Sequence, residues 1–359
     1  MKYLAIVLCA LFLLGCGGDD VTVSPADAGT TVDAGSDAGK PTPPPVDAGS
    51  VCKLDGGLAS GTLDQGSTQD LPMTYKGGPV MSAPVNVYFI WYGNWDNTKA
   101  ISILEQMMLD LDKSAWYQIV TGYYQEVKDP TPDAGVADAA PPDAGDASVP
   151  EAGTKSQVYA SSRVNLIKSI YVGTPHGTSL SDDDIATIVT EVISSGKLPP
   201  DPDGLYFVLT SKEIDEGAGW SGFCSSYCGW HNSASILGVD IKYSFVGDGD
   251  KCPDACSLRS IYEKMGIVKS PNDNWSADAM VSVILHELVE SVTDPDPIST
   301  PAWQDDYGYE NGDKCAWTFG DLYQTNNCSI ANVPIGSHDF IVQQNWILTK
   351  DGGHCGLHP

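Results

Sequence analysis

The chain has 359 residues, and its 47 acidic side chains outnumber the 19 basic ones, which gives a formal net charge of -28 at pH 7. Nucleic-acid phosphates and anionic lipid surfaces repel such a charge, so we expect neither as a partner.

The first sixteen residues have the pattern of an export signal. Lys2 supplies a positive charge, an apolar run follows at 4–14, and Leu13-Leu14-Gly15-Cys16 resembles a bacterial lipobox. The apolar run is too short to span a bilayer as a mature helix. We predict a lipoprotein signal peptide at 1–16, with Cys16 as the lipidated residue. The mature protein is then held at the bacterial cell envelope, outside the cytoplasm, by its acyl chains alone. An ordinary signal peptide is the alternative.

Two tracts rich in Asp, Ala, Gly and Pro contain almost no large apolar side chain, and they lie at 17–50 and 129–153. Such tracts cannot bury enough apolar surface to offset the entropy lost on ordering. We predict a disordered tether at 17–50 and a single domain at 51–359 with a disordered insertion at 129–153. A boundary between two domains at the second tract is the alternative, which the small size of 78–127 disfavours.

Strands and helices are predicted along the rest of the chain from β-branched and aromatic runs, helical spacing and caps. One helix begins at a cap formed by Ser181 to Asp184 and ends at Gly196. Strands are expected at 85–92, 164–172, 204–210 and 235–246, and helices at 97–112 and 181–195.

The most informative stretch is 276–294, which is predicted to be a buried helix. Ser276 is the expected N-cap, and Pro295 stops the helix. An apolar stripe at helical spacing supports burial, and its members are Val281, Ile284, Leu285, Leu288 and Val292.

This helix contains His286-Glu287-Leu288-Val289-Glu290. His286 and Glu290 are one turn apart on one face, so they can hold one metal ion. Glu287 is rotated by about 100° and can act on a water molecule at the metal. This is the HExxH pattern of zinc proteases with Glu in place of the second His. The alternative is a solvated ion pair that contributes only about 0.3–0.5 kcal/mol.

Ten cysteines are present, of which two precede the mature domain. An even number in an exported chain predicts up to four disulfides. The remaining eight are Cys52, Cys224, Cys228, Cys252, Cys256, Cys315, Cys328 and Cys355. The two C-x-x-x-C pairs among them are alternatively a four-cysteine zinc site.

Several segments in order resemble the plant exordium family, also called phosphate-induced protein 1. The likeness covers about 78–355 except the insertion. It is carried by Val85–Trp95 (Val-Asn-Val-Tyr-Phe-Ile-Trp-Tyr-Gly-Asn-Trp), His176-Gly177-Thr178, Cys228-Gly229-Trp230-His231, Met280 to Glu290, and Glu310 followed by Gly312-Asp313. The resemblance implies a secreted, cell-wall-associated protein linked in plants to growth responses, and it brings no settled biochemical activity.

Further expectations follow from this resemblance. Cys52 and Cys328 are additional to the family's cysteines, so we expect them to pair. His176 and His231 match the family, and we interpret both as structural hydrogen-bonding groups. Glu310 is the first choice for a third metal ligand because a downstream Glu completes several zincin sites and because this residue matches the family.

Asp313 and Asp294 are the reserve choices for that third ligand. We expect Zn²⁺ at this site. One nitrogen and two carboxylates are a harder ligand set than a histidine-rich one, which lowers the expected zinc affinity and makes Mn²⁺ or Ca²⁺ the alternatives. A calcium site that orders a loop in the acid-rich stretch 294–313 is a further alternative.

The predicted fold is α+β: a zincin-like mixed sheet with flanking helices, the metal-site helix, and a disulfide-rich irregular C-terminal part. Two functions remain open. The first is an exported, lipid-anchored metal-dependent hydrolase, above all a zincin-like metallopeptidase, with Glu287 as general base. The second is a non-catalytic cell-surface module with a structural metal or a polar core around His286. We expect a monomer whose partner is an extracellular peptide, protein or glycan.

Overall fold

The computed structural model describes residues 71–128 and 155–359, apart from position 218. The predicted signal peptide, its Cys16, the tether at 17–50 and the insertion at 129–153 lie outside these residues. Within the described part, no helix combines the length and apolar character that a membrane span requires.

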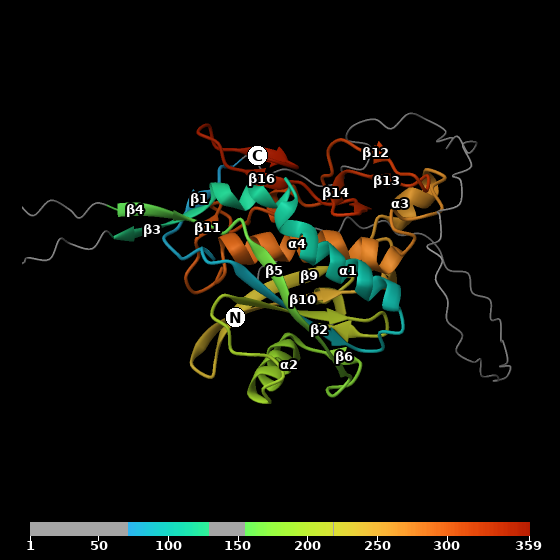
Figure 1. Cartoon of the computed structure of the whole chain (residues 1–359), viewed down its shortest axis with the longest axis horizontal. Helices are drawn as coiled ribbons and strands as arrows, with labels where there is room; N and C mark the ends of the chain where they lie inside the picture. The colour runs from blue at the N-terminus through green and yellow to red at the C-terminus, as the bar shows by residue number, and fades with distance from the viewer. Residues whose placement is uncertain (1–70, 129–154, 218) are drawn as a thin grey trace, which may run out of the picture. The chain divides into compact units, whose positions relative to one another are not determined.

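A five-stranded sheet forms the centre of the fold (Figure 1), and its strand order is β5-β2-β7-β10-β9. The first four strands are parallel, and β9 is antiparallel to β10 at one edge. Their bounds are Val164–Gly173 for β5, Val85–Tyr92 for β2, Gly204–Thr210 for β7, Val239–Gly247 for β10 and Gly229–Ile236 for β9. The sheet is therefore mixed, as predicted.

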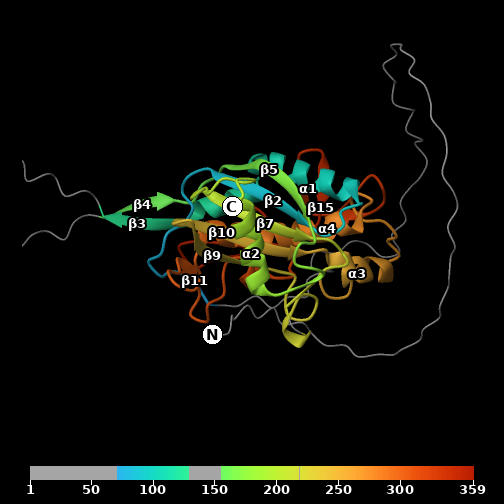
Figure 2. The same cartoon turned by 90° about the horizontal axis from the view of Figure 1, so that it is seen from below.

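Helices cover both faces of the sheet. On one face, α1 (Thr98–Asp110) and α4 (Trp275–Thr293) pack on alternate β2 side chains such as Phe89 and Trp91. On the other face, α2 (Asp182–Ser194) packs on Tyr88 and Ile90, and Figure 2 shows it lying across the sheet. The central strand is buried on both sides, which explains why its sequence is continuously apolar and aromatic.

Local signals place α2 as predicted. The Ser181 hydroxyl accepts from the Asp184 N–H, and the Asp184 carboxylate accepts from the Ser181 N–H. These two bonds form a capping box and satisfy two otherwise unpaired groups at the helix start. The predicted helix at 97–112 is also confirmed, with a 3-10 turn at Leu111–Lys113 after its last residue.

The remaining elements are short, and the β1–β11 pair joins the N-terminal end of the described part to the C-terminal part. Residues 294–359 contain only strands of two or three residues, one 3-10 turn and the Cys315–Cys355 disulfide, so the irregular C-terminal part is confirmed. Paired short strands are β1 (Thr74–Tyr75) with β11 (Trp303–Gln304), β3 (Tyr124–Lys128) with β4 (Lys155–Tyr159), β6 (Ser179–Leu180) with β8 (Asp215–Glu216), β12 (Tyr323–Gln324) with β13 (Ile330–Ala331), β14 (Val333–Ile335) with β15 (His338–Phe340), and β16 (Asn345–Ile347) with β17 (His354–Gly356). The other helices are α3 (Arg259–Lys264) and 3-10 turns at Tyr117–Gly122, Gly219–Ser221, Gly249–Lys251 and Asp313–Cys315.

The strand predicted at 235–246 is wrong at its start, because a tight turn at Leu237 and Gly238 divides it into β9 and β10. Both turn residues have positive φ, 52° and 79°, which is the geometry of a two-residue hairpin loop. A leucine rarely adopts this conformation, so the sequence carries no ordinary turn signal here.

The predicted N-cap Ser276 is also wrong. Asn274 caps α4 by accepting from the Ala277 N–H at 3.0 Å. Ser276 lies inside the first turn, where its hydroxyl donates to Asp248 at 2.6 Å. Either side chain type can cap a helix, and the tertiary contact with Asp248 decides between them.

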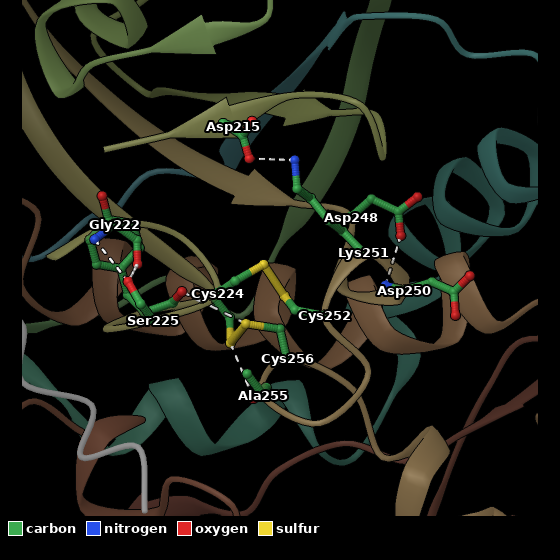
Figure 3. The surroundings of a disulfide bond; sticks show 12 residues. Asp215, Gly222, Cys224, Ser225, Asp248, Asp250, Lys251, Cys252, Ala255 and Cys256 are labelled. Carbon is green, nitrogen blue, oxygen red and sulfur yellow. Dashed lines mark hydrogen bonds and ion pairs between the residues drawn. A yellow bond between two sulfur atoms is a disulfide. The ribbon is translucent and has the colours of Figure 1, made fainter. Parts of the chain in front are cut away.

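Two disulfides join the loop before β9 to the segment after β10, namely Cys224–Cys252 and Cys228–Cys256. Figure 3 shows the Cys224–Cys252 bond with Cys256 close by. The alternative of a four-cysteine zinc site is therefore wrong. Cys328 is disulfide-bonded as well, and its predicted partner Cys52 lies outside the described residues.

Candidate metal centre on helix α4

Helix α4 is covered on both sides, by the sheet and by the C-terminal segments (Figure 1). Glu287 is 4% exposed and Glu290 is 3% exposed. The alternative of a solvated ion pair on this helix is therefore wrong. Buried carboxylates need strong compensation from hydrogen bonds, positive charges or metal ions.

One group of side chains forms around His286. Its Nε2 lies 3.0 Å from Oε1 of Glu290 and 3.6 Å from Oδ1 of Asp313. The Asp313 N–H donates to the same Glu290 oxygen at 2.9 Å. A Cβ at position 312 would lie 2.8 Å from Glu290 Oε1 and 2.9 Å from His286 Nδ1, so Gly312 lets the chain approach closely enough.

A second group forms around His231, which β9 brings to the same helix. Its Nδ1 lies 3.3 Å from Oε2 of Glu287 and 3.6 Å from Oε2 of Glu290. Its Nε2 lies 3.2 Å from the Asp294 carbonyl and 3.5 Å from Oε1 of Glu310. His231 forms hydrogen bonds as expected, and it also lies among four acidic residues, which the sequence does not show.

The spacing of each group fits one metal ion. Two atoms bound about 2.0–2.2 Å from a tetrahedral zinc ion lie roughly 3.3–3.6 Å apart. The four N···O separations within the two groups range from 3.0 to 3.6 Å. Imidazole nitrogen with carboxylate oxygen is a donor set that suits zinc or manganese. Each group of three side chains therefore fits a divalent cation.

The choice of third ligand changes with this geometry. Asp313, the reserve choice, stands with His286 and Glu290 in one compact group. Glu310 lies instead at the far nitrogen of His231. Asp294 contributes its carbonyl to His231, and its Oδ1 accepts from the Ala302 N–H at 2.7 Å.

Burial and like charge disfavour ionised carboxylates here. Burial raises the pKa of Glu290 to about 7 and that of Asp294 to about 7. Burial and then the nearby carboxylates raise the pKa of Glu310 well above its usual range. For His286, burial would lower the pKa, but Glu290 and Asp313 outweigh it and hold the pKa well above normal.

An amide fixes the orientation of the His286 ring. The Trp317 N–H donates to Oε1 of Gln343 at 2.7 Å, so the Gln343 NH₂ group must face His286 Nδ1, 2.8 Å away. In neutral His286, Nδ1 therefore accepts and Nε2 carries the proton. A metal ion at Nε2 requires the ring proton to be on Nδ1, so the Gln343 amide must turn its oxygen toward His286. The turn breaks the hydrogen bond from Trp317, at a net cost of about 0.5–1.5 kcal/mol. The binding free energy of a structural zinc ion is about 10–16 kcal/mol, which is far larger than the cost of turning the amide.

The centre opens into a cleft. His286 and Glu287 line it together with Ser282 and Val283, which lie on the same helix. The opposite wall is mostly apolar and aromatic, and one part of it is the Cys228–Cys256 disulfide. Large apolar side chains in the lining are Leu258, Tyr262, Trp275, Trp317, Phe319 and Ile341. A cleft of this composition, with a few polar groups at one end, is typical of a ligand site.

His176 behaves as expected for a structural histidine. Its Nε2 pairs with Oε2 of Glu191 on α2 at 3.0 Å, at the protein surface. The different environments of His176 and His231 depend on tertiary structure. Only a correct prediction of β9 and its position beside α4 would have shown this difference.

The fold and the site define a mixed α+β protein with a candidate metal centre on the helix that follows its sheet. The model of the family described as "Phosphate-induced protein 1 conserved region" matches residues 73–330, and the chain belongs to this family.

Two curated relatives come from Arabidopsis thaliana. The chain is 29% identical to "Protein EXORDIUM-like 5" over 277 residues, which cover 73% of the chain and 69% of the relative. It is 27% identical to "Protein EXORDIUM-like 3" over 241 residues, which cover 64% of each protein. No solved structure matches the chain.

Proposed function

We propose that this protein is a metal-dependent hydrolase, and that it acts on peptides as zincin-like metallopeptidases do. One observation carries the proposal. His286, Glu290 and Asp313 present three donor atoms at metal-ligand separations, directly beside Glu287 and a cleft. Three protein ligands with an adjacent acid at a cleft are what a hydrolytic metal site requires.

The architecture supports the same proposal. A mixed sheet precedes the helix that carries the ligands, and a loop-rich part with the third ligand follows. This order agrees with the general plan of zincin-like domains. The ligands come from a rigid helix and from a 3-10 turn at Asp313–Cys315, which holds Asp313 against Glu290.

Each side chain has a defined task in this proposal. A bound divalent ion supplies Lewis-acid polarisation of a substrate carbonyl. Glu287 takes a proton from the attacking water and returns it to the leaving amine. His231 holds the Glu287 carboxylate through Oε2, and the other oxygen, Oε1, lies beside Gly229, where a Cβ would come within 3.0 Å of it. The apolar wall binds a substrate side chain and excludes water.

A second candidate function has its own support. Glu287 is bonded to His231 and is almost fully buried, which suits a structural polar core in a non-catalytic surface module. In that case the cleft binds a peptide or glycan without cleaving it. Both functions require a ligand in the cleft, and only the hydrolase cleaves it.

The test combines metal content with hydrolysis. The purified mature protein is dialysed against zinc, manganese or calcium and then incubated with a broad peptide library. Bound metal with hydrolysis, and loss of hydrolysis in Glu287→Gln, would support the hydrolase. Bound metal without any cleaved peptide would support the binding module. No bound metal after all three dialyses would remove the premise of a metal site.

We also propose that the protein is exported and anchored through a lipidated Cys16, with the domain outside the cytoplasm. The lipobox sequence and the disulfides support this location. Cys16→Ala should release the protein from the membrane fraction. Retention of that variant in membranes would contradict the anchor.

A further inference from the structure

Glu290 faces two different histidines with its two oxygens. Oε1 belongs to the group of His286 and Asp313, and Oε2 belongs to the group of His231 and Glu287. A carboxylate in this position can bridge two cations, and paired metal ions in hydrolases lie about 3.5–4 Å apart. The group of His286, Glu290 and Asp313 already has three donor atoms, so the group of His231 and Glu287 is free to bind a separate ion.

The hydrogen bond at Nε2 orients the His231 ring so that its Nδ1 faces two carboxylates. Its Nε2 lies 3.2 Å from the Asp294 carbonyl, which can only accept, so Nε2 carries a proton. An ion bound at Nδ1, between Glu287 and Glu290, would replace the proton that Nδ1 shares with Glu287 Oε2 at 3.3 Å. A backbone carbonyl that orients the far side of a ligating histidine is a recurring support of metal sites.

The distances around His231 and the net charge of the site also favour a second cation. The Nδ1 contacts of 3.3 and 3.6 Å are longer than the usual 2.9 Å of a hydrogen bond and match ligand spacing. Five acidic residues surround the two histidines, and no lysine or arginine of the described residues forms an ion pair with any of them. Two divalent ions balance such a site better than one. The acidic residues are Glu287, Glu290, Asp294, Glu310 and Asp313.

Glu310 supplies an independent observation. Its carboxylate is 7% exposed, and Oε1 makes no hydrogen bond within the described residues. This oxygen is directed at the His231 ring, 3.5 Å from Nε2. A buried carboxylate oxygen without a hydrogen-bond donor is costly unless positive charge lies nearby.

We propose that the protein holds a second divalent cation between His231 Nδ1, Glu287 Oε2 and Glu290 Oε2, with Glu290 bridging two ions. This inference rests on the proposed function for the first ion, at His286, Glu290 and Asp313. Glu287 gives its Oε2 to the second ion in this arrangement and keeps Oε1 as the proton acceptor. Glu310 then stabilises the positive charge that the ion induces on the His231 ring.

Metal stoichiometry tests the proposal on the full mature protein. Equilibrium dialysis with zinc followed by elemental analysis should give two ions per chain in the wild type. His231→Ala should bind one ion, Asp313→Ala one ion, and Glu290→Ala none. His176→Ala is the matched control, because this surface histidine pairs only with Glu191, and it should keep two.

A second measurement needs no variant. With Mn²⁺ bound, the electron paramagnetic resonance spectrum of the wild type should show coupling between two nearby ions. An uncoupled spectrum with one ion per chain, unchanged in His231→Ala, would overturn the second site and leave the proposed function intact. Failure to bind any ion would overturn both. Circular dichroism distinguishes a lost site from an unfolded variant.

Discussion

Helices α2 and α4 lie on opposite faces of one sheet, and both carry acidic residues. On α2 the acids remain near water: Asp184 completes a capping box, and the Glu191 side chain is 55% exposed. On α4 the acids are buried, because the C-terminal segments cover the side that faces away from the sheet. An acid on a helix therefore indicates chemistry when it is buried beside histidine and without a lysine or arginine partner.

The largest effect should come from Glu290→Ala, because both ligand groups use this residue. The variant should lose metal binding and with it the metal-induced rise in thermal stability. That stabilisation amounts to about 4 kcal/mol when the free metal is a thousandfold above Kd. Calorimetry with and without zinc measures it. Glu191→Ala on α2 should keep the full zinc-induced shift, and an equal loss in both variants would contradict the comparison.

Glu287→Gln should reduce peptide hydrolysis by about 10²–10⁴-fold, since the amide cannot accept the proton. The ion at His286, Glu290 and Asp313 should remain, because Glu287 is outside that group. Steady-state rates and elemental analysis measure the two effects. Glu263→Gln, on the exposed side of α3, is a control that should hydrolyse normally. Normal rates in Glu287→Gln would contradict the proposed task of Glu287.

The stability of the metal-free protein should depend on pH in a direction set by α4. Burial raises the folded-state pKa of Glu290 from 4.5 to about 7, so the folded form binds the proton more tightly than the unfolded form. Stability should therefore be greatest near pH 4.5 and fall as the pH rises to about 7. On α2 the direction is opposite. Hydrogen bonds from Ser181 lower the pKa of Asp184, so the contribution of this carboxylate to stability is lost as the pH falls.

Thermal midpoints of the metal-free protein between pH 5 and 8 check this sign. The midpoint should fall across the range, and saturating zinc should remove most of the fall, because a cation favours the ionised carboxylates. A midpoint that rises with pH in the metal-free protein would show that the α4 acids are ionised and compensated in another way.

Gln343→Glu should tighten metal binding by about tenfold, because a carboxylate accepts from both Trp317 N–H and His286 Nδ1–H and frees Nε2 for the ion. Changes in the partners of ligating histidines alter metal affinity by about 10–100-fold. Competition with a chelator measures the affinity. Gln344→Glu adds the same charge at the next position, where the side chain lies beside Gly320, and should have little effect. Weaker binding in Gln343→Glu would contradict the assigned hydrogen-bond directions.

The smallest effect belongs to α2. Ser181→Ala removes one half of the capping box and should lower the free energy of unfolding by about 0.5–2 kcal/mol. Metal affinity should stay unchanged, because the helix lies on the opposite face of the sheet. Urea titration and a chelator assay measure the two quantities. A change in metal affinity would mean that the two faces are coupled.

Much of the fold follows from local signals. The continuous apolar run at 85–92 predicts the central strand, and Ser181 with Asp184 predicts the start of α2. Strand β9 gives no such signal, because its Gly-Trp-His-Asn-Ser-Ala-Ser-Ile sequence has only one β-branched aliphatic residue, Ile236. Its pairing with β10 decides its structure, and for that reason the sequence does not show that His231 lies beside α4.

The site was predictable where helical periodicity determines spacing and unpredictable elsewhere. His286, Glu287 and Glu290 follow from the turn of one helix. Asp313 and Glu310 lie on an irregular segment, where no period relates sequence distance to position. The close approach allowed by Gly312 places Asp313 against Glu290, and only the folded chain shows it.

The paired disulfides beside β9 link the geometry of the site to the oxidation state of four cysteines. His231 stands three residues after Cys228, whose bond to Cys256 fixes the start of the strand and forms part of the cleft wall. While the thiols remain reduced, this end of the strand lacks its covalent attachment and the second ligand group is poorly held. Oxidation of Cys228 and Cys256 therefore fixes the position of His231 beside α4, and reduction of this one bond would loosen the second ligand group without removing any of its side chains.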